Sequence, residues 1–592
     1  MPGPGDRGTE KQKPKHARRT LLRLIRYLMV YGWAVALFLL CALLSNIGNL
    51  LGPNFAGKAI AAASAGAGNV AIPTVIRYGI LMLIAYVSSN ILSFLVNIGM
   101  MRVGRKVARN MRRDVFNKLM EMPVGYFDRH LAGDIISRVS YDIDVVCASL
   151  STDVVQILTS LITVAGSFVM MCIISPPLVL CMAFTIPVSI LFTRHMSRKT
   201  RPLYRLRSRS YGEMNGFAEE MFTGQKTILA YAREEDICHR FEQINRNAAE
   251  SYRNADGLGM TMGPTVGMIS NIGLSAIGLG GAMLYMRGIV DIGQISSFIL
   301  YSRKFSGPIN EISNIVSEIF SALAAAERVF QLLDEEEEVK DLPDAAPLER
   351  AEGNVEVRDV SFGYLPGKPV LKDFRLKAQP GQTIAIVGHT GAGKTTLINL
   401  LMRFYDVSDG AVYVDGREVR AYTLRSLRKS YSMVLQDTWV FRGTIFDNIA
   451  YGKENATTEE VVAAAKAAHI HNYIMRLPAG YQTVISEDGG NISKGQKQLI
   501  TIARAMLYDT GMLILDEATS NVDTATERKV QKAMRSLMAG KTCFIIAHRL
   551  STIRNADNIL VVDEGNVVEQ GTHEDLMARR GAYYRLYQSQ FE

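Results

Sequence analysis

The sequence predicts two unlike parts: an all-helical membrane domain of six spans, followed by a water-soluble α/β domain. The chain has 592 residues, a length that suits two to four domains. Four uncharged segments in its first half are each long enough to cross a bilayer, for which about 20 residues suffice. These segments lie between Arg26 and Lys58, Arg77 and Arg102, Asp153 and Arg194, and Asp256 and Arg287. These spans exclude a purely soluble enzyme. After Phe330 the composition changes abruptly, to an acidic run and then a water-soluble domain.

Two further features bring the count of spans to six. The uncharged stretch from Val154 to Thr193 is about twice as long as one span. Ser175-Pro176-Pro177 lies at its middle, and because proline ends helices, we expect a helical hairpin there. The fourth uncharged segment supplies the span through Gly257–Met286, and the sixth span begins near Ile292.

Basic residues give the orientation of the membrane domain. Nine Lys or Arg lie between Arg102 and Arg138, and twelve between Arg194 and Arg253, whereas the opposite loops carry only Lys58 and Arg287. The positive-inside rule therefore places the N-terminus and both long loops in the cytoplasm. A segment near the tip of each loop, 122–128 and 230–236, interrupts the basic helical pattern and is a candidate for docking another domain.

The predicted domains follow from these patterns. They are a basic cytoplasmic tail (1–22), a membrane domain (23–330) with long cytoplasmic loops at about 102–145 and 194–255, an acidic linker (331–352) and an α/β domain (353–592). Six widely spaced cysteines indicate neither a disulfide framework nor a zinc site. Because the N-terminal segment has neither a cleavable signal pattern nor an organelle-targeting pattern, we expect a bacterial plasma membrane.

Charged residues also occur inside the sixth predicted span. Arg303 and Lys304 lie about 12 residues inside it, and Glu311 follows on the face of Lys304. Charges at such a depth often face a cavity or mark a pathway. Alternatively, the helix begins later, or the charges pair with a neighbouring helix. The sequence leaves these alternatives open.

The α/β domain contains a phosphate-binding loop. Residues 388–395 read Gly-His-Thr-Gly-Ala-Gly-Lys-Thr, which fits G-x4-G-K-[ST] between an apolar strand and a helical run. In such a loop the backbone N–H groups converge on phosphates at a helix N-terminus. We expect Lys394 to reach the β- and γ-phosphates, and Thr395 to supply a hydroxyl to Mg²⁺.

Two carboxylates and a histidine complete a candidate hydrolytic site. Asp516 and Glu517 end the buried strand that begins at Met512. We expect Asp516 to hold Mg²⁺ through water, and Glu517 to orient or deprotonate the attacking water. His548 follows another apolar strand and is expected to hydrogen-bond the γ-phosphate.

In this order the motifs resemble those of ATP-binding cassette (ABC) transporters, and the resemblance covers nearly the whole chain. Besides the phosphate loop, it rests on Gln436 in Val-Leu-Gln-Asp, the segment Ile492-Ser493-Lys494-Gly495-Gln496, Asp516-Glu517, Asp523 and His548. Six spans in front of the cassette resemble a half-size exporter, in which two chains assemble.

The resemblance implies roles for particular residues. Tyr364 would stack on adenine, Gln436 would sense Mg²⁺ and the γ-phosphate, and Asp523 would lie in the loop joining the two ATP sites. It also implies that 122–128 and 230–236 are coupling helices resting on the nucleotide-binding domains. The residues expected to bind ATP are Tyr364, Gly388, His389, Thr390, Gly391, Ala392, Gly393, Lys394, Thr395, Thr396, Ser493, Gly495, Gln496 and Asp523. Those expected to act in catalysis are Glu517, His548 and Gln436, and those at Mg²⁺ are Thr395, Gln436 and Asp516.

Departures from the family pattern bear on assembly. The family signature reads Leu-Ser-Gly-Gly-Gln, whereas Lys494 here replaces a glycine. Asp488 stands where arginine is common, and Asn521-Val522 replaces the commoner Ala-Leu. Because each ATP in this family lies between one chain's phosphate loop and the other chain's signature, a heterodimer with one impaired site is expected. A homodimer that tolerates the lysine is the alternative.

An ATP-driven exporter is therefore the expected function, moving an amphipathic small molecule, lipid or peptide by alternating access, with Arg303, Lys304 and Glu311 as candidates for the cavity wall. The alternative is an ATP-gated membrane sensor or regulator, but an intact Glu517 disfavours it. A nucleic-acid-handling ATPase is disfavoured because the basic residues lie beside the membrane spans rather than in one soluble patch.

Overall fold

The chain forms two compact units. The computed structural model describes residues 16–64, 70–436, 438–486, 490–516, 524–547 and 553–591; within these it leaves out the side chains of 181–186, 189–190, 309–314, 524–525 and 590–591. One unit comprises the chain up to Glu121 together with Leu131–Glu336. The other comprises Met122–His130 and the chain from Glu337 onward.

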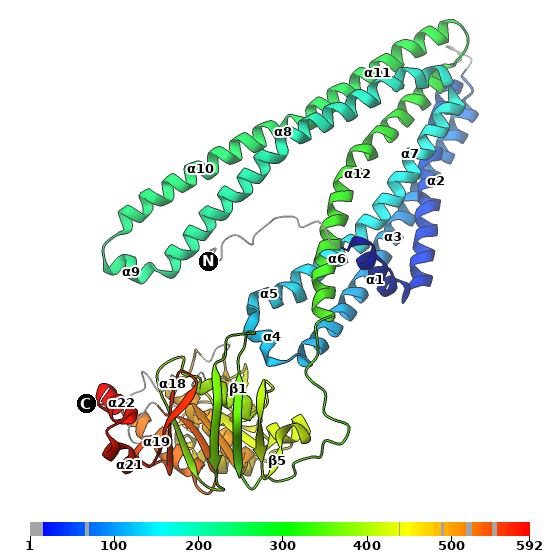
Figure 1. Cartoon of the computed structure of the whole chain (residues 1–592). Helices are drawn as coiled ribbons and strands as arrows, with labels where there is room; N and C mark the ends of the chain where they lie inside the picture. The colour runs from blue at the N-terminus through cyan, green and yellow to red at the C-terminus, as the bar shows by residue number, and fades with distance from the viewer. Residues whose placement is uncertain are drawn as a thin grey trace. The chain divides into compact units, whose positions relative to one another are not determined.

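The first unit is entirely helical in its described residues, and its elements are coloured blue to green in Figure 1. Its long helices lie where the six spans were predicted, and several extend well beyond the length of one span. Their bounds are α1 Ala17–Met29, α2 Gly32–Ala63, α3 Ile72–Met120, α5 Ala132–Ser137, η2 Arg138–Asp142, α6 Ile143–Ala148, η3 Ser149–Asp153, α7 Val154–Ile174, α8 Pro176–Thr223, α9 Gln225–Ala230, α10 Glu234–Met260, α11 Met262–Met286 and α12 Ile292–Leu333.

Local sequence explains where these helices begin and end. The predicted hairpin break is confirmed: α7 ends at Ile174, Ser175 is extended, and α8 begins at Pro176. Proline fits this first helical position because its missing N–H would have no partner there. Asp291 caps α12 by accepting the backbone N–H of Gln294 at 2.6 Å, in a reciprocal capping box. Helix α12 therefore begins where predicted, and the alternative that it begins later is wrong.

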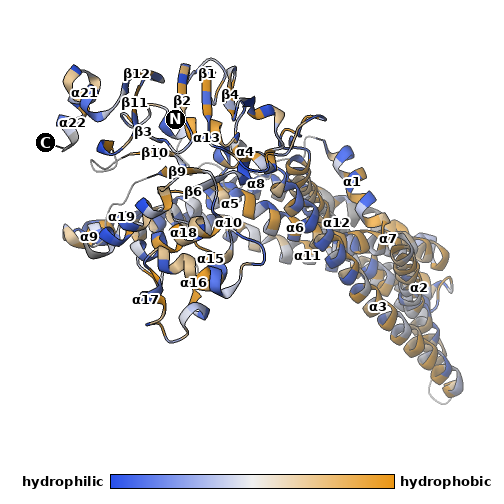
Figure 2. Cartoon of the chain, turned by 90° about the horizontal axis from the view of Figure 1, so that it is seen from below, coloured by the Kyte–Doolittle hydropathy of each residue, from blue (hydrophilic) through white to orange (hydrophobic). Residues whose placement is uncertain are grey.

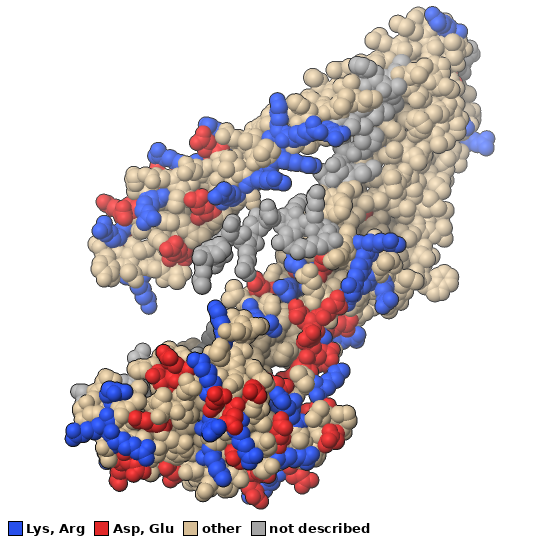
Figure 3. Space-filling view, viewed as in Figure 1, with Lys and Arg blue, Asp and Glu red and all other residues tan. Residues whose placement is uncertain are grey.

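Hydrophobic residues predominate along α2, α3 and α7 (Figure 2). Among the described residues, four helical stretches are long and apolar enough to cross a membrane. They lie within Gly32–Ala63, Ile72–Met120, Ala132–Ile174 and Glu234–Met286. Some side chains of α8 and α12, the other two predicted spans, lie outside the described residues. Figure 3 shows few charged side chains on the visible face of the bundle and many along α8 and α10.

Small residues let α2 and α12 approach closely. A Cβ added at Gly57 would overlap the Ser297 hydroxyl and the Gly293 carbonyl, and one added at Gly293 would overlap the Gly57 carbonyl. Membrane helices gain no hydrophobic free energy by leaving lipid, so they associate through this kind of close packing.

The second unit is an α/β domain built on three sheets. The four-stranded sheet has the order β2-β1-β4-β5, the six-stranded sheet β12-β11-β3-β10-β9-β6, and the smallest β7-β8. The strands are β1 Val355–Phe362, β2 Leu371–Ala378, β3 Thr383–Val387, β4 Asp409–Val414, β5 Arg417–Glu418, β6 Tyr431–Val434, β7 Gly443–Thr444, β8 Val484–Ile485, β9 Met512–Asp516, β10 Thr542–Ile546, β11 Asn558–Asp563 and β12 Asn566–Gly571. The helices are α4 Val124–Arg129, α13 Lys394–Leu401, α14 Leu424–Lys429, α15 Ile445–Ala450, α16 Thr458–Ala467, α17 His471–Ile474, α18 Lys494–Tyr508, α19 Thr524–Met538, α21 His573–Arg579 and α22 Ala582–Phe591.

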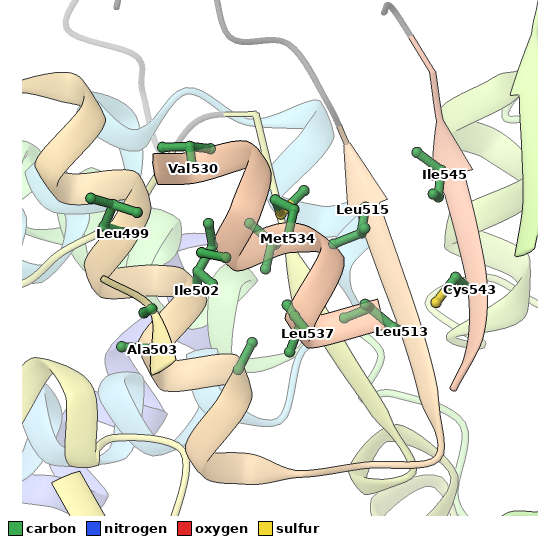
Figure 4. Packing of buried hydrophobic residues seen from close by; sticks show 14 of the residues in the cluster. Leu499, Ile502, Ala503, Leu513, Leu515, Val530, Met534, Leu537, Cys543 and Ile545 are labelled. Carbon is green, nitrogen blue, oxygen red and sulfur yellow. The ribbon is translucent and has the colours of Figure 1, made fainter. Parts of the chain in front are cut away.

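The central strands are buried on both faces, which explains their continuous apolar sequence. Leu513 and Leu515 of β9 pack with Cys543 and Ile545 of β10 against α18 and α19 (Figure 4). The alternate residues of the same strands, such as Ile514, join a second cluster with β1 and α13. Burial of each such aliphatic side chain stabilises the folded domain by about 1.5–3 kcal/mol. This packing keeps the strands in place, and with them the strand ends that carry the site.

Candidate nucleotide site

The phosphate loop connects β3 to α13. Its last glycine, Gly393, has a φ of +105° at the N-cap of α13, a backbone conformation that favours glycine. A Cβ there would also lie 2.7 Å from the Leu371 side chain. The first N–H groups of α13 have no partner within the helix, so the loop and the helix terminus form an anion-binding cradle.

Lys394 lies at the start of α13 and turns back over this loop. Its Nζ donates to the carbonyls of Gly388 at 2.7 Å and His389 at 2.8 Å. Burial lowers the pKa of Lys394, and the charge of Asp516 opposes that shift. A half-buried ammonium whose hydrogen bonds within the described residues go to two neutral carbonyls is suited to exchange them for phosphate oxygens.

Parallel register brings separate motifs to one edge of the sheet. Strand β10 lies between β3 and β9, and β6 lies beyond β9, all four parallel. Ile546 pairs with both Ile386 and Asp516, and Val434 pairs with Leu515. The carboxyl ends therefore lead together into the phosphate loop, Asp516 and, two residues beyond β6, the exposed Gln436.

The expected magnesium ligands fit a hard cation in their chemistry. Thr395 offers an exposed hydroxyl, Asp516 a carboxylate and Gln436 an amide oxygen, and Mg²⁺ prefers oxygen ligands. Glu517, Asp523 and His548 lie outside the described residues, so their predicted roles remain predictions. Asp516 and Ala547 are the described residues that precede Glu517 and His548.

Tyr364 lies beside the phosphate-loop helix. Its hydroxyl donates to Thr396 Oγ1 at 3.2 Å and accepts from Asn399 Nδ2 at 3.1 Å. The ring meets Tyr405 edge-on, with centroids 5.0 Å apart, and Tyr364 is 42% exposed. An exposed, anchored aromatic ring next to the phosphate loop is suitable for stacking on a base.

The signature segment begins α18. Ser493 is the N-cap, and its hydroxyl accepts the Gln496 backbone N–H at 3.3 Å, while Gln496 Oε1 accepts the Ser493 N–H at 2.9 Å. Lys494 is the first residue of the helix and is exposed, whereas Gly495 is buried. The capping box thus fixes the helix start and leaves the lysine facing outward.

The loop tip 122–128 packs within the second unit, as predicted for the first coupling segment. Tyr126 of α4 is 2% exposed, and Asp128 accepts the Tyr405 hydroxyl at 2.5 Å. Burial, followed by this carboxylate, raises the pKa of Tyr405. The sequence indicated the segment but not Tyr405, which follows α13 and belongs to no motif. In the described chain, every residue of the second segment, 230–236, is exposed, and α9, which leads into it, buries none of its residues. The second segment therefore stays a prediction.

Known families match both units. Residues 35–309 match the profile of the ABC transporter transmembrane region, and 371–520 match the ABC transporter profile. The chain is 40% identical over 583 residues, 98% of its length, to the uncharacterized ABC transporter ATP-binding protein YfiC of Bacillus subtilis (strain 168), covering 96% of that protein. The chain belongs to the ABC transporter family.

Other relatives indicate to which branch of the ABC transporter family the chain is similar. The chain is 45% identical over 483 residues to the fatty acid ABC transporter ATP-binding/permease protein of Mycobacterium bovis (strain ATCC BAA-935 / AF2122/97), covering 81% of this chain and 76% of that protein. The structure of a bacterial Atm1-family ABC exporter with ATP bound is similar to it with a TM-score of 0.76 and 28% identity, over 95% of this chain and 99% of that one. The protein is thus a multi-pass membrane ABC exporter, whose ATP-binding cassette couples ATP hydrolysis to transport. The predicted fold class is confirmed.

Proposed function

We propose that this exporter hydrolyses ATP with Mg²⁺ at a site composed of its own phosphate loop and a partner's signature, and exports an amphipathic lipid-like substrate. The observation that carries the proposal is the register that brings the phosphate loop, Asp516 and Gln436 to one sheet edge. The name of the mycobacterial relative supports a fatty-acid-like substrate.

The residues have distinct tasks in this proposal. Lys394 leaves its two loop carbonyls and binds phosphate oxygens, while the N–H groups of α13 hold the remaining charge. Thr395, Gln436 and Asp516 would hold Mg²⁺, and the ion would supply positive charge against the phosphates. Glu517 accepts a proton from the attacking water, and His548 hydrogen-bonds the γ-phosphate. Tyr364 stacks on adenine.

We also propose that the partner is a different half-transporter. The exposed Lys494 supports this, because it adds bulk where the family signature has glycine. In this assembly, the hydrolytic site pairs the phosphate loop of this chain with the partner's unaltered signature. The signature of this chain faces an impaired site.

ATP hydrolysis by the purified chain tests both proposals. The chain alone, in liposomes, is expected to hydrolyse ATP slowly, and a co-expressed half-transporter with a glycine-containing signature to accelerate it. Glu517→Gln in this chain should retain ATP binding and lower hydrolysis by the accelerated pair about 10²- to 10⁴-fold, as for loss of a general base. ATP-dependent transport of a fluorescent fatty acid across the liposome membrane should fall together with ATP hydrolysis.

Three other results would contradict parts of this proposal. Rapid hydrolysis by the chain alone, abolished by Glu517→Gln, would show a homodimer. Hydrolysis unchanged in Glu517→Gln would remove the proposed role of Glu517. ATP hydrolysis without vectorial transport of any amphiphile would favour the alternative of a membrane sensor.

A further inference from the structure

Three side chains on one face of α12 form a polar ladder with α2 inside the membrane bundle. The three are four and three residues apart, a spacing that puts them on one helix face. Each donates a hydrogen bond to a backbone carbonyl of α2. The pairs are Ser297 with Pro53 at 2.9 Å, Tyr301 with Leu50 at 2.6 Å, and Lys304 with Asn49 at 2.7 Å.

The carbonyl that Lys304 contacts has a specific reason to need a donor. In an α-helix the N–H of residue 53 would bond the carbonyl of residue 49, but Pro53 has no N–H. An unpaired carbonyl in a bilayer is costly, because no water is present to donate a hydrogen bond to it. A neutral hydroxyl would satisfy it, as Ser297 and Tyr301 do for the neighbouring carbonyls, so the positive charge of Lys304 needs another explanation.

The depth of this contact makes the charge costly. Asn49 lies 14 residues before the end of α2 at Ala63, and Lys304 lies 12 residues after the start of α12 at Ile292. At 1.5 Å per residue these are about 21 and 18 Å from the outer helix ends. The hydrocarbon core is about 30 Å thick, so the ammonium lies well inside it.

The neighbours of Lys304 orient the ammonium without neutralising it. Besides the Asn49 carbonyl it contacts Asn49 Oδ1, and its Nζ lies 5.6 Å from the centre of the Tyr86 ring on α3. Among the described side chains, no carboxylate forms an ion pair with it. Glu311 follows about 10.5 Å along the helix axis, and its side chain lies outside the described residues.

We propose that Lys304, oriented by Asn49 and Tyr86, binds the carboxylate or phosphate headgroup of an amphipathic substrate between α2, α3 and α12. The inference rests on the proposed export function and narrows its substrates to anionic amphiphiles. Lys304 is half-buried, so its ammonium is not sealed from a ligand. A cation inside the membrane carries a desolvation cost, and an anionic headgroup that binds beside it offsets part of that cost.

Equilibrium binding without ATP tests this site separately from hydrolysis. The full chain is placed in nanodiscs of phosphatidylcholine, and binding of radiolabelled oleate, 1-oleoyl lysophosphatidic acid and 1-oleoyl lysophosphatidylcholine is measured. Lys304→Gln retains a neutral donor for the Asn49 carbonyl, and Lys304→Arg retains the charge. Lys58→Gln is the matched control, because Lys58 lies exposed on α2 with its Nζ 5.7 Å from the Tyr78 ring.

Lys304→Gln is expected to weaken binding of the anionic ligands about tenfold or more, the loss typical of a charge-assisted hydrogen bond. Lys304→Arg should stay within about threefold of the native protein, and Lys58→Gln should not change binding. Weak binding of the zwitterionic ligand should be insensitive to all three. Tight binding of oleate alone, or of the lysophosphatidate alone, supports the site and identifies the headgroup.

The proposal is overturned if the native chain binds neither anion, or if Lys304→Gln binds both as the native chain does. Equal losses in Lys304→Gln and Lys304→Arg would also overturn it, since the lysine would then only lock two helices.

If Lys304→Gln does not fold, photolabelling of the native chain decides. A diazirine fatty acid reactive beside its carboxylate should label peptides containing Asn49 or Lys304, and labelling elsewhere only would contradict the site. ATP hydrolysis and export, measured independently, show whether the proposed function itself holds.

Discussion

Tyr364 illustrates how a single side chain is prepared for nucleotide binding. The hydroxyl lies between Thr396 and Asn399 of α13, and Tyr405 meets the ring edge-on. These contacts fix the ring before any base arrives, which lowers the entropic cost of stacking.

Substitution of Tyr364 separates the ring from its anchor. Tyr364→Ala should raise KM for ATP about tenfold or more, because base–aromatic stacking is worth about 1–3 kcal/mol. Tyr364→Phe keeps the ring and loses only the hydroxyl contacts, so KM should rise less than about threefold. Steady-state hydrolysis by the assembled transporter measures both. Equal KM values for the two variants would show that the ring does not contact the base.

The residues around the phosphate loop also show which contacts short sequence motifs can predict and which they cannot. The phosphate loop and Asp516 were predicted from short patterns, and the structure brings them to one edge. Tyr405 and Asn399 could not be predicted in this way, because their contacts depend on which side of α13 faces Tyr364 and α4. No local pattern contains that information.

At the scale of elements, α4 is joined to the α/β domain by a hydrogen bond. Tyr405 donates to Asp128, and the same Tyr405 ring touches Tyr364. A nucleotide that stacks on Tyr364 would thereby be linked, through Tyr405 and Asp128, to the loop between α3 and α5. We expect this contact to transmit the effect of ATP to the membrane helices.

Removing the hydrogen bond between Tyr405 and Asp128 should weaken the coupling between substrate binding in the membrane domain and ATP hydrolysis. Tyr405→Phe and Asp128→Ala should each leave basal ATP hydrolysis nearly unchanged and lower substrate-stimulated hydrolysis several-fold. Since both remove one interaction, the double variant should lose no more than either single variant. Additive losses in this cycle would show that the two residues act independently.

The contact between α2 and α12 gives a second test at this scale. Gly57→Val should lower stability by about 1–3 kcal/mol, as in overpacked cores, because a Cβ would overlap Ser297 and Gly293. Gly79→Val on α3 is the control, since no described atom lies within 4 Å of an added Cβ there. Thermal unfolding in detergent should separate the two, and equal melting temperatures would contradict the packing.

At the scale of the whole molecule, the signature decides how two chains share their sites. Lys494→Gly restores the family residue at an exposed helix start whose capping box is made by Ser493 and Gln496 and does not involve the lysine side chain. We expect this variant to raise ATP hydrolysis by the chain alone about tenfold or more, equivalent to about 1.4 kcal/mol. Unchanged hydrolysis in a chain that is already active would show that a homodimer tolerates the lysine.

The sequence by itself determined the broad plan of this exporter. Uncharged segments, basic loops and the order of the nucleotide motifs are local or periodic features, so they predicted the helical membrane part, the α/β part and the phosphate loop. The Ser175-Pro176-Pro177 break and the start of α12 followed from proline and capping chemistry, which act within a few residues.

Only the tertiary structure decided which distant residues meet. Lys304 and Asn49 are 255 positions apart, and Tyr405 and Asp128 are 277 apart. Such contacts depend on how whole helices and strands pack, because a side chain's partner is set by the rotation and register of two elements at once. For this reason Lys304 was an unexplained charge in the sequence, and its partners Asn49 and Tyr86 became visible only in the folded bundle.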